Sequence, residues 1–305
     1  MIDISIVIPV FNSEDILKEL SKQIDEALIN ISYELILIND CSKDNSWNVI
    51  STLQKTNKHI VGINLRKNSG QDNAIMAGLN YSLGNYVVIM DDDLQHSPID
   101  IIPLVNQCKK GFDVCYANFN KKKQKWWKNI GSWINGKIAE ILINKPSHIY
   151  LSPFQVINKE IVKEVIKYQG PYPYVQGLIL RTTNNLTQIN IKHHKRLSGK
   201  GNFNFIKSMI VFVKLMTSFS VIPLRIATVI GFITALLGFA MIPYYLAMYF
   251  FNDEIIEGWT SLMIIILMLG GILLVSVGML GEYIGRMFLD TNRKPQFVIK
   301  SILKK

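Results

Sequence analysis

The chain has 305 residues, 49% of them hydrophobic, and a formal net charge of +10 at pH 7. It is long enough for a sizeable core and for more than one structural unit. Its three cysteines have no CxxC spacing, which argues against a metal cluster or a disulfide framework. The mean hydropathy of +0.21 is high for a soluble protein. Together, the high hydropathy and the positive charge indicate a partner such as anionic lipid rather than nucleic acid.

Strand and helix patterns alternate over residues 1–116. Strands are expected at 4–10, 33–38, 60–65 and 86–90, and helices at 13–29, 44–54 and 72–82. Ser13 is a candidate N-cap for the first helix. Strands that alternate with helices predict a parallel, three-layer α/β sheet.

The second half of the chain is less regular and then strongly apolar. A basic run at 121–128 contains Trp126 and Trp127, and a helix is expected to follow to about residue 143. Residues 203–222 resemble an interfacial helix. Residues 226–251 and 258–281 carry no charge, and each exceeds the roughly 20 residues needed to cross a bilayer.

Charges around the two apolar segments predict their orientation. The connection at 252–257 contains acids but no Lys or Arg, whereas basic residues flank the pair on both sides. The positive-inside rule then predicts that both flanks lie in the cytoplasm. We expect no signal peptide, because the first residues lead straight into a strand pattern. We expect a cytoplasmic catalytic domain at 1–200, a juxtamembrane helix at 201–225, a two-helix transmembrane hairpin at 226–284 and a basic cytoplasmic tail at 285–305.

An acidic triplet, Asp91 to Asp93, ends the strand at 86–90. Alternate residues near a strand end face the same way, so Asp91 and Asp93 could hold one divalent cation. Mg²⁺ or Mn²⁺ held by few carboxylates keeps open positions for phosphate oxygens. The segment therefore predicts a metal–diphosphate site, against the alternative of a solvated acidic turn.

Polar residues at other strand ends should lie near this triplet, because the carboxyl ends of parallel strands share one edge. The first strand ends at residues 9–14 and includes Pro9, Phe11 and Glu14, and the second ends at Asp40. Phe11 could flank a nucleotide base and Asp40 could bind a base or ribose. Taken singly, packing of Phe11 and turn chemistry at Asp40 are the simpler explanations.

Basic residues supply candidate phosphate ligands. Arg66 precedes a helix opened by Ser69 and Gly70, and helix N-termini attract phosphate. Arg196 and Lys200 precede the predicted membrane entry and suit phosphate better than the neighbouring histidines suit zinc. The chain has neither a GxGxxG turn nor a GxxxxGK[ST] loop, which argues against a dinucleotide-binding enzyme and a P-loop NTPase.

Several stretches resemble glycosyltransferases of family 2 that act on polyisoprenyl phosphates. The chain is similar to dolichyl-phosphate mannose synthases and to bacterial undecaprenyl-phosphate glycosyltransferases. The matching stretches are residues 7–12, 37–44, 68–78, 91–96, 280–286 and 294–296.

This resemblance implies a GT-A fold, a Rossmann-like three-layer sheet, followed by interfacial helices and the hairpin. It assigns metal roles to Asp91, Asp93 and Gln95, and it places Asp92 in the same triplet. It puts Asp40 and the turn from Pro9 to Phe11 on the nucleotide, with Gly70 and Gln71 in a matching stretch. It implies that Lys128 and Ser132 contact the acceptor phosphate, and Arg196 and Lys200 correspond to the family's Arg…Gly-Lys-Ser element.

Two departures from the family pattern bear on sugar choice and on activity. Many relatives have an Asp in the segment that matches residues 151–155, followed by an Arg; here no Asp is present and Gln155 replaces the Arg. Phe119 also stands where many relatives have Arg.

The expected function is transfer of a sugar from a nucleotide sugar, by default a UDP-sugar, to undecaprenyl phosphate at the cytoplasmic leaflet. A single in-line displacement would invert the anomeric carbon. A homo-oligomer and a partner flippase are further expectations. Direct transfer to a hydroxyl of a polysaccharide or lipid glycan, and non-catalytic binding of a nucleotide sugar, are the alternatives.

Overall fold

The computed structural model describes residues 2–119, 145–191, 222–251, 258–292 and 294–304. Two compact units can be distinguished, and each is described by itself. The first comprises Met1–Phe203 together with Arg293–Lys305, and the second is Asn204–Asn292. The chain thus leaves the first unit and returns to it at the C-terminus.

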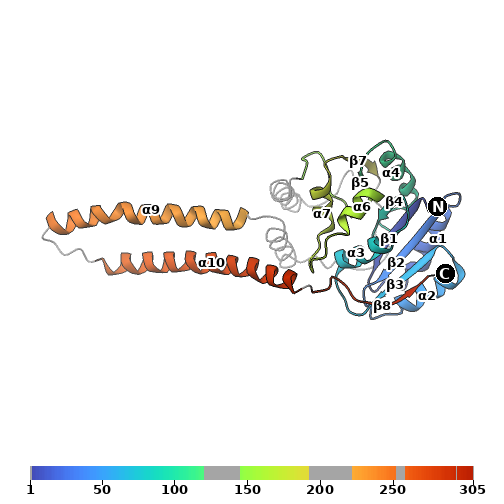
Figure 1. The fold of residues 1–305 in the computed structure, drawn as a ribbon, viewed down its shortest axis with the longest axis horizontal. Helices are drawn as coiled ribbons and strands as arrows, with labels where there is room; N and C mark the ends of the chain where they lie inside the picture. The colour runs from blue at the N-terminus through green and yellow to red at the C-terminus, as the bar shows by residue number, and fades with distance from the viewer. Residues whose placement is uncertain (1, 120–144, 192–221, 252–257, 293, 305) are drawn as a thin grey trace. The chain divides into compact units, whose positions relative to one another are not determined.

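The first unit is built on an eight-stranded sheet with the order β7-β5-β6-β4-β1-β2-β3-β8 (Figure 1). The strands are β1 Ile4–Val10, β2 Tyr33–Asn39, β3 Ile60–Leu65, β4 Tyr86–Ile89, β5 Val114–Phe119, β6 Gln155–Asn158, β7 Leu186–Ile191 and β8 Ile299–Leu303. The first four strands are parallel, as predicted. β6 and β8 run antiparallel to their neighbours, so the sheet is mixed.

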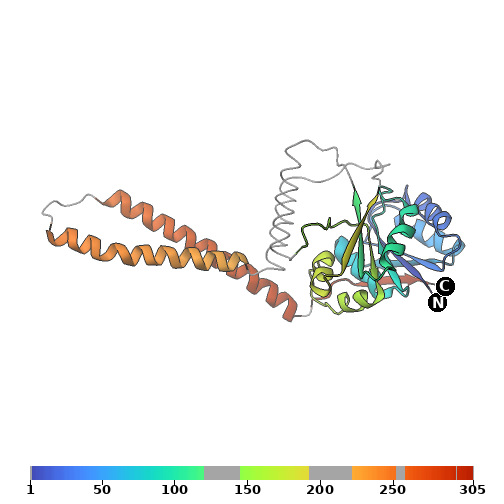
Figure 2. The same ribbon diagram turned by 90° about the horizontal axis from the view of Figure 1, so that it is seen from above.

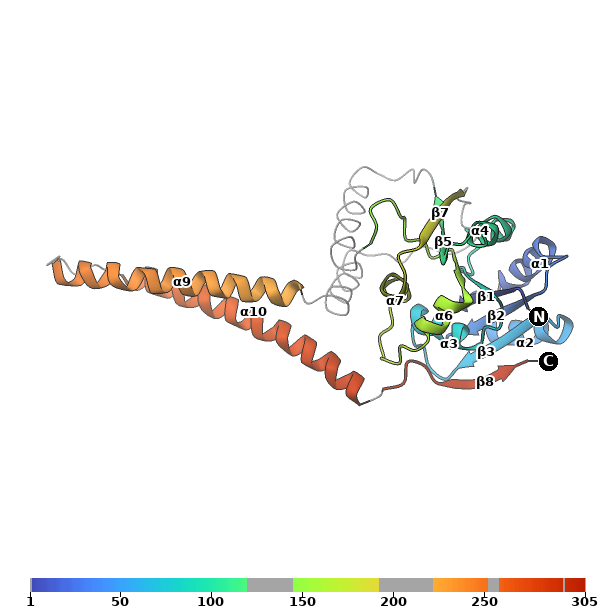
Figure 3. The same cartoon turned by 45° about the horizontal axis from the view of Figure 1, so that its top comes forward.

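Helices cover both faces of the sheet, as Figures 2 and 3 show. They are α1 Leu17–Ala27, α2 Ser46–Thr56, α3 Gln71–Tyr81, α4 Ile101–Cys108, α6 Lys159–Val165 and α7 Val175–Thr182. Alternation along β1 explains the layers. Ile4, Ile6 and Ile8 share a core cluster with residues of α1 and α4, whereas Val7 faces α3 on the other side. Both faces are apolar, as buried parallel strands require.

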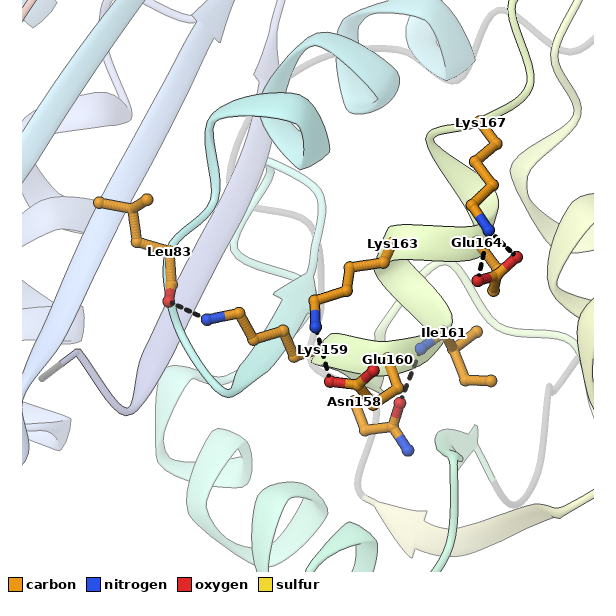
Figure 4. A network of polar contacts seen from close by, with 8 residues as sticks. All are labelled: Leu83, Asn158, Lys159, Glu160, Ile161, Lys163, Glu164 and Lys167. Atoms are coloured by element: carbon orange, nitrogen blue, oxygen red, sulfur yellow. Dashed lines mark hydrogen bonds and ion pairs between the residues drawn. The ribbon is translucent and has the colours of Figure 1, made fainter.

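One helix on this frame is fixed by local polar contacts, which Figure 4 shows. Asn158 caps α6 by accepting a hydrogen bond from the Ile161 backbone N–H at 2.9 Å. Lys163 pairs with Glu160 across one turn at 2.9 Å. Such exposed ion pairs add little to stability, so the cap does more to define where α6 begins.

The second unit contains α9 Ile222–Phe251 and α10 Trp259–Thr291, which contact each other. Among the described residues, one helical segment, Met268–Leu289, is long and apolar enough to cross a membrane, with a mean hydropathy of 1.6. A shorter apolar segment runs from Leu224 to Ala240. Large apolar side chains such as Phe239 and Leu274 are exposed on these helices.

Helix starts differ from the expectation in two places. Ser13 does not cap α1, whose N-cap position is Ile16 with no side-chain cap. The Ser13 hydroxyl instead donates to Asp92 at 2.5 Å. α2 begins at Ser46 rather than at residue 44 because the Asp44 carboxylate accepts from the Ser46 backbone N–H.

The C-terminal segment also differs from the expected tail. α10 continues to Thr291, and β8 then pairs antiparallel with β3 at the sheet edge. Alternating exposure along β8 is typical of an edge strand with one face on the protein. The expected helix after the basic run and the interfacial helix at 203–222 lie outside the described residues, apart from Ile222 at the start of α9.

Candidate active site

A pocket of about 320 Å³ lies where β1, β2 and β4 end and α3 begins. The described residues that line it are Pro9, Val10, Phe11, Asp40, Asn68, Gly70, Gln71, Asp91, Asp92 and Asp93. The edge therefore brings together most of the residues that sequence analysis selected, drawn from four separate stretches. No Lys, Arg or His stands among them.

Each of the three strand-end loops contains a non-glycine residue with left-handed backbone geometry. The φ angles are +56° for Asn12, +56° for Cys41 and +57° for Leu94. Residues other than glycine seldom adopt this backbone region, and a bulky residue such as leucine adopts it least readily. Such strain gathered around one pocket is typical of a functional site.

Asp40 holds the loop that opens α3. Its carboxylate accepts hydrogen bonds from the backbone N–H groups of Ser69, at 2.7 Å, and Gly70, at 2.9 Å. Gly70 needs its φ of +91° here, a value that glycine reaches without strain. Asp40 is 4% exposed and lines the pocket, so it organises the site whatever else it binds.

The three carboxylates of the triplet have different partners. Asp91 accepts from the Gln71 side-chain amide at 2.8 Å, and Asp92 accepts from the Ser13 hydroxyl. Asp93 accepts from the backbone N–H of Gln95 at 3.1 Å. Burial raises the pKa of Asp92, with Asp93 adding to the shift and the hydrogen bond from Ser13 opposing it. The three acids are therefore partly or fully buried, and each carboxylate accepts a hydrogen bond.

The donor set suits a hard divalent cation. Asp91 and Asp93 both line the pocket. Carboxylate oxygens are the ligands that Mg²⁺ and Mn²⁺ prefer. The described residues contain no cluster of three or more His, Cys, Asp or Glu placed to hold a metal alone. Mg²⁺ is usually held by one or two carboxylates with substrate phosphates and waters, so two carboxylates fit a site that is shared with a diphosphate.

Three predicted residues do not line this pocket. Glu14 accepts from the Asn45 backbone N–H at 2.7 Å and so braces the β1 and β2 loops against each other. The Arg66 backbone N–H donates to Val298, next to β8. Gln95 contributes its backbone N–H to Asp93, as described above. Four further predicted phosphate-binding residues lie outside the described residues: Lys128, Ser132, Arg196 and Lys200.

A second pocket of about 220 Å³ adjoins the first, and Gln71 lines both. Its other polar lining residues are Asp72, Gln155, Tyr174 and Gln176, and the rest of the described lining is apolar. Burial raises the pKa of Asp72 to about 6, against a weaker opposing hydrogen bond from the Val175 backbone N–H. Burial, with Asp72 nearby, raises the pKa of Tyr174 to about 12.

Sequence analysis did not find this second pocket. It noted Gln155 only as a departure from a family pattern, and Asp72 only as part of a helix start. The signal that was available is a polar Gln in an otherwise apolar strand, since Gln155 is 1% exposed in β6.

The fold is that of GT-A glycosyltransferases. A similar solved structure is glucosyl-3-phosphoglycerate synthase from Mycobacterium tuberculosis in complex with Mn²⁺ and UDP-glucose. The superposition covers 71% of this chain and 77% of the synthase chain, with a TM-score of 0.54 and 16% sequence identity. At this identity the likeness concerns the fold alone.

The chain belongs to glycosyl transferase family 2, whose model matches residues 5–166, more than half of the chain. The model of the GtrB C-terminal hairpin matches residues 222–287, which span α9 and most of α10.

Two curated relatives are similar over nearly the full chain. An Enterobacter protein named undecaprenyl-phosphate 4-deoxy-4-formamido-L-arabinose transferase is 28% identical over 99% of this chain and 94% of its own length. A prophage bactoprenol glucosyl transferase homolog of Escherichia coli K12 is 29% identical over 99% of this chain and 99% of its own length.

Proposed function

We propose that this family 2 enzyme transfers a sugar from a nucleotide sugar, by default a UDP-sugar, to a polyprenyl phosphate at a membrane. The observation that carries the proposal is the strand-end pocket. It gathers Asp40 and the acidic triplet at one edge, yet its described lining has no basic side chain. Clustered carboxylates repel one another unless a cation joins them, and a cation shared with a diphosphate meets that need.

The chain's own residues would orient the donor. Phe11 is 47% exposed at the pocket and offers an apolar face to a nucleotide base. Asp91 and Asp93 would hold Mg²⁺ or Mn²⁺, with Gln71 fixing the Asp91 carboxylate. When bound, the divalent ion supplies charge stabilisation for the departing diphosphate. The solved glucosyl-3-phosphoglycerate synthase with Mn²⁺ and UDP-glucose supports this choice of donor and ion.

A lipid phosphate acceptor agrees with the C-terminal unit. The match to the GtrB hairpin and the exposed apolar side chains of α9 and α10 favour a membrane location. The names of the Enterobacter and Escherichia relatives favour an undecaprenyl phosphate acceptor. A phosphomonoester has a second pKa of about 6 and is largely ionised at pH 7. It could therefore attack the anomeric carbon in one inverting step with little help from a general base.

The chain's course supports an even number of crossings. It leaves the sheet unit before α9 and returns to it as β8. A hairpin of two crossings would leave both flanks on one side, and the basic residues around it favour the cytoplasmic side.

The test uses membranes that contain the full chain, undecaprenyl phosphate, Mg²⁺ or Mn²⁺ and a panel of radiolabelled nucleotide sugars. Label extracted into organic solvent reports transfer to the lipid. We expect one donor to label the lipid, and Asp93→Asn to reduce the rate at least tenfold. Asp15→Asn, at an exposed acid outside the pocket, is the matched control.

Three outcomes would overturn all or part of the proposal. Full activity of Asp93→Asn at saturating metal would show that Asp93 does not hold the divalent ion. Label on a polysaccharide or lipid glycan instead of the lipid phosphate would establish the hydroxyl-directed alternative. If the folded protein transfers no sugar from any donor, the remaining explanation is that it binds a nucleotide sugar without catalysing transfer.

A further inference from the structure

Two residues that line the second pocket, Gln155 and Gln176, carry side-chain acceptor atoms that nothing in the described structure satisfies. The Oε1 atoms of Gln155 and Gln176 are buried and have no hydrogen-bond partner among the described residues. The orientation of Gln176 is set, because its Nε2 donates to the Ser152 carbonyl at 2.9 Å. Leaving a buried acceptor unpaired is unfavourable, so a buried unpaired acceptor requires an explanation.

The chemistry of the lining defines what could satisfy these atoms. Asp72 also lines this pocket, and its carboxylate accepts from the Val175 backbone N–H at 3.3 Å. The described lining contains no Lys, Arg or His. An anion such as phosphate would be repelled by this set, whereas a neutral group rich in O–H donors would pair with it.

The size and position of the pocket restrict the ligand further. The volume of about 220 Å³ is smaller than the 320 Å³ of the strand-end pocket, which suits one ring rather than a nucleotide. Ile75, Ile89 and Val175 give the pocket an apolar wall between its polar groups. Gln71 lines both pockets and donates to Asp91, so the second pocket opens beside the proposed diphosphate site.

We propose that this second pocket binds the hydroxyl groups of the transferred sugar, and that Gln155 and Gln176 select which sugar the enzyme accepts. The assignment rests on the proposed function and adds to it the residues that determine donor specificity. The nucleoside diphosphate would occupy the strand-end pocket alone, and only the sugar would reach Gln155.

Gln155→Met is the decisive variant. Methionine keeps the length of the side chain and removes an amide whose Oε1 is unpaired, so the fold should hold, with an unchanged or higher melting temperature. Gln54→Met is the matched control, because Gln54 is also buried, 7% exposed, but lies in α2 and lines neither pocket.

Binding is measured on the full chain with Mn²⁺ present. The probes are UDP-glucose, UDP-galactose, UDP-N-acetylglucosamine and GDP-mannose, each beside its nucleoside diphosphate. We expect Gln155→Met to weaken binding of at least one sugar nucleotide about three- to tenfold, the loss of one neutral hydrogen bond. The affinity for UDP and GDP should not change. The preference between UDP-glucose and UDP-galactose in the transfer assay should shrink as well.

The outcomes separate this inference from the proposed function. If the wild type binds and transfers a sugar while Gln155→Met binds every probe as the wild type does, the second pocket holds water only and the inference fails alone. Equal weakening of sugar nucleotides and diphosphates would also overturn it. If the wild type binds no probe and no diphosphate, both proposals fail.

Discussion

Gln71 donates its side-chain amide to Asp91 at 2.8 Å while it lines both pockets. One residue at the first turn of α3 thus joins the acidic pocket to the neighbouring polar one. The start of α3 is itself held by Asp40, so the geometry of both pockets depends on a single helix terminus.

Replacement of Gln71 by Met should lower kcat/KM about tenfold. A hydrogen bond to a charged group is worth about 1.5–3 kcal/mol, and its loss lets the Asp91 carboxylate turn away from the pocket. The measurement is lipid-linked label as a function of nucleotide-sugar concentration. Gln23→Met is the control, since Gln23 makes the same kind of bond to Glu19, at 2.8 Å, on the exposed side of α1. Equal kcat/KM for both variants would show that the bond to Asp91 has no catalytic part.

Asp40→Asn should destabilise the protein and weaken nucleotide binding together. The amide offers only one acceptor oxygen, and its NH₂ would face the N–H of Ser69 or Gly70. We expect the free energy of unfolding to fall by about 2 kcal/mol, the cost of one lost charge-assisted bond. Thermal unfolding and UDP titration measure the two effects. Weaker UDP binding with unchanged stability would mean that Asp40 acts on the nucleotide and not on the loop.

Gly78→Ala should loosen the contact between α3 and the sheet. A Cβ at this position would lie 2.4 Å from Val7 Cγ1 and 2.8 Å from Ile38 Cδ1. Overpacking of this kind costs about 1–3 kcal/mol, and displacement of α3 would also reduce activity. Adding Val7→Ala makes room for the methyl group, so the double variant should recover part of the loss in thermal unfolding. Additive losses from the two changes would contradict the steric explanation.

The pocket residues nearest in sequence to strand ends were predictable, and the second pocket was not. Asp40 and Asp91 each follow an apolar run, so a local pattern places them at the same sheet edge. Asp72 and Val175 are 103 positions apart, and no periodicity links them. The same limit explains Ser13, which suits a helix cap by sequence but donates to Asp92, 79 residues away.

Asp72→Asn should stabilise the ligand-free protein at neutral pH. Burial raises the pKa of Asp72 to about 6 from an ordinary value of 3.8, so the folded state favours the protonated carboxyl. Stability is then highest below pH 4 and falls as the pH rises through about 6, by about 1–3 kcal/mol. Asn cannot ionise and escapes this loss.

The comparison of melting temperatures at pH 8 and pH 4 checks the prediction. The gain from Asp72→Asn should be present at pH 8 and should shrink toward pH 4, and the exposed-site variant Asp15→Asn should show neither effect. A gain of the same size at both pH values would mean that ionisation of Asp72 is not its cause.

The pairing of β8 with β3 has a consequence for biosynthesis. β8 leaves the ribosome only after the whole of α9 and α10. Until then β3 is an uncovered edge, and an uncovered edge invites pairing with other chains. The N-terminal sheet therefore cannot be finished during its own translation. A nascent chain that stalls within the apolar helices is an aggregation hazard, whereas a completed chain closes its own edge.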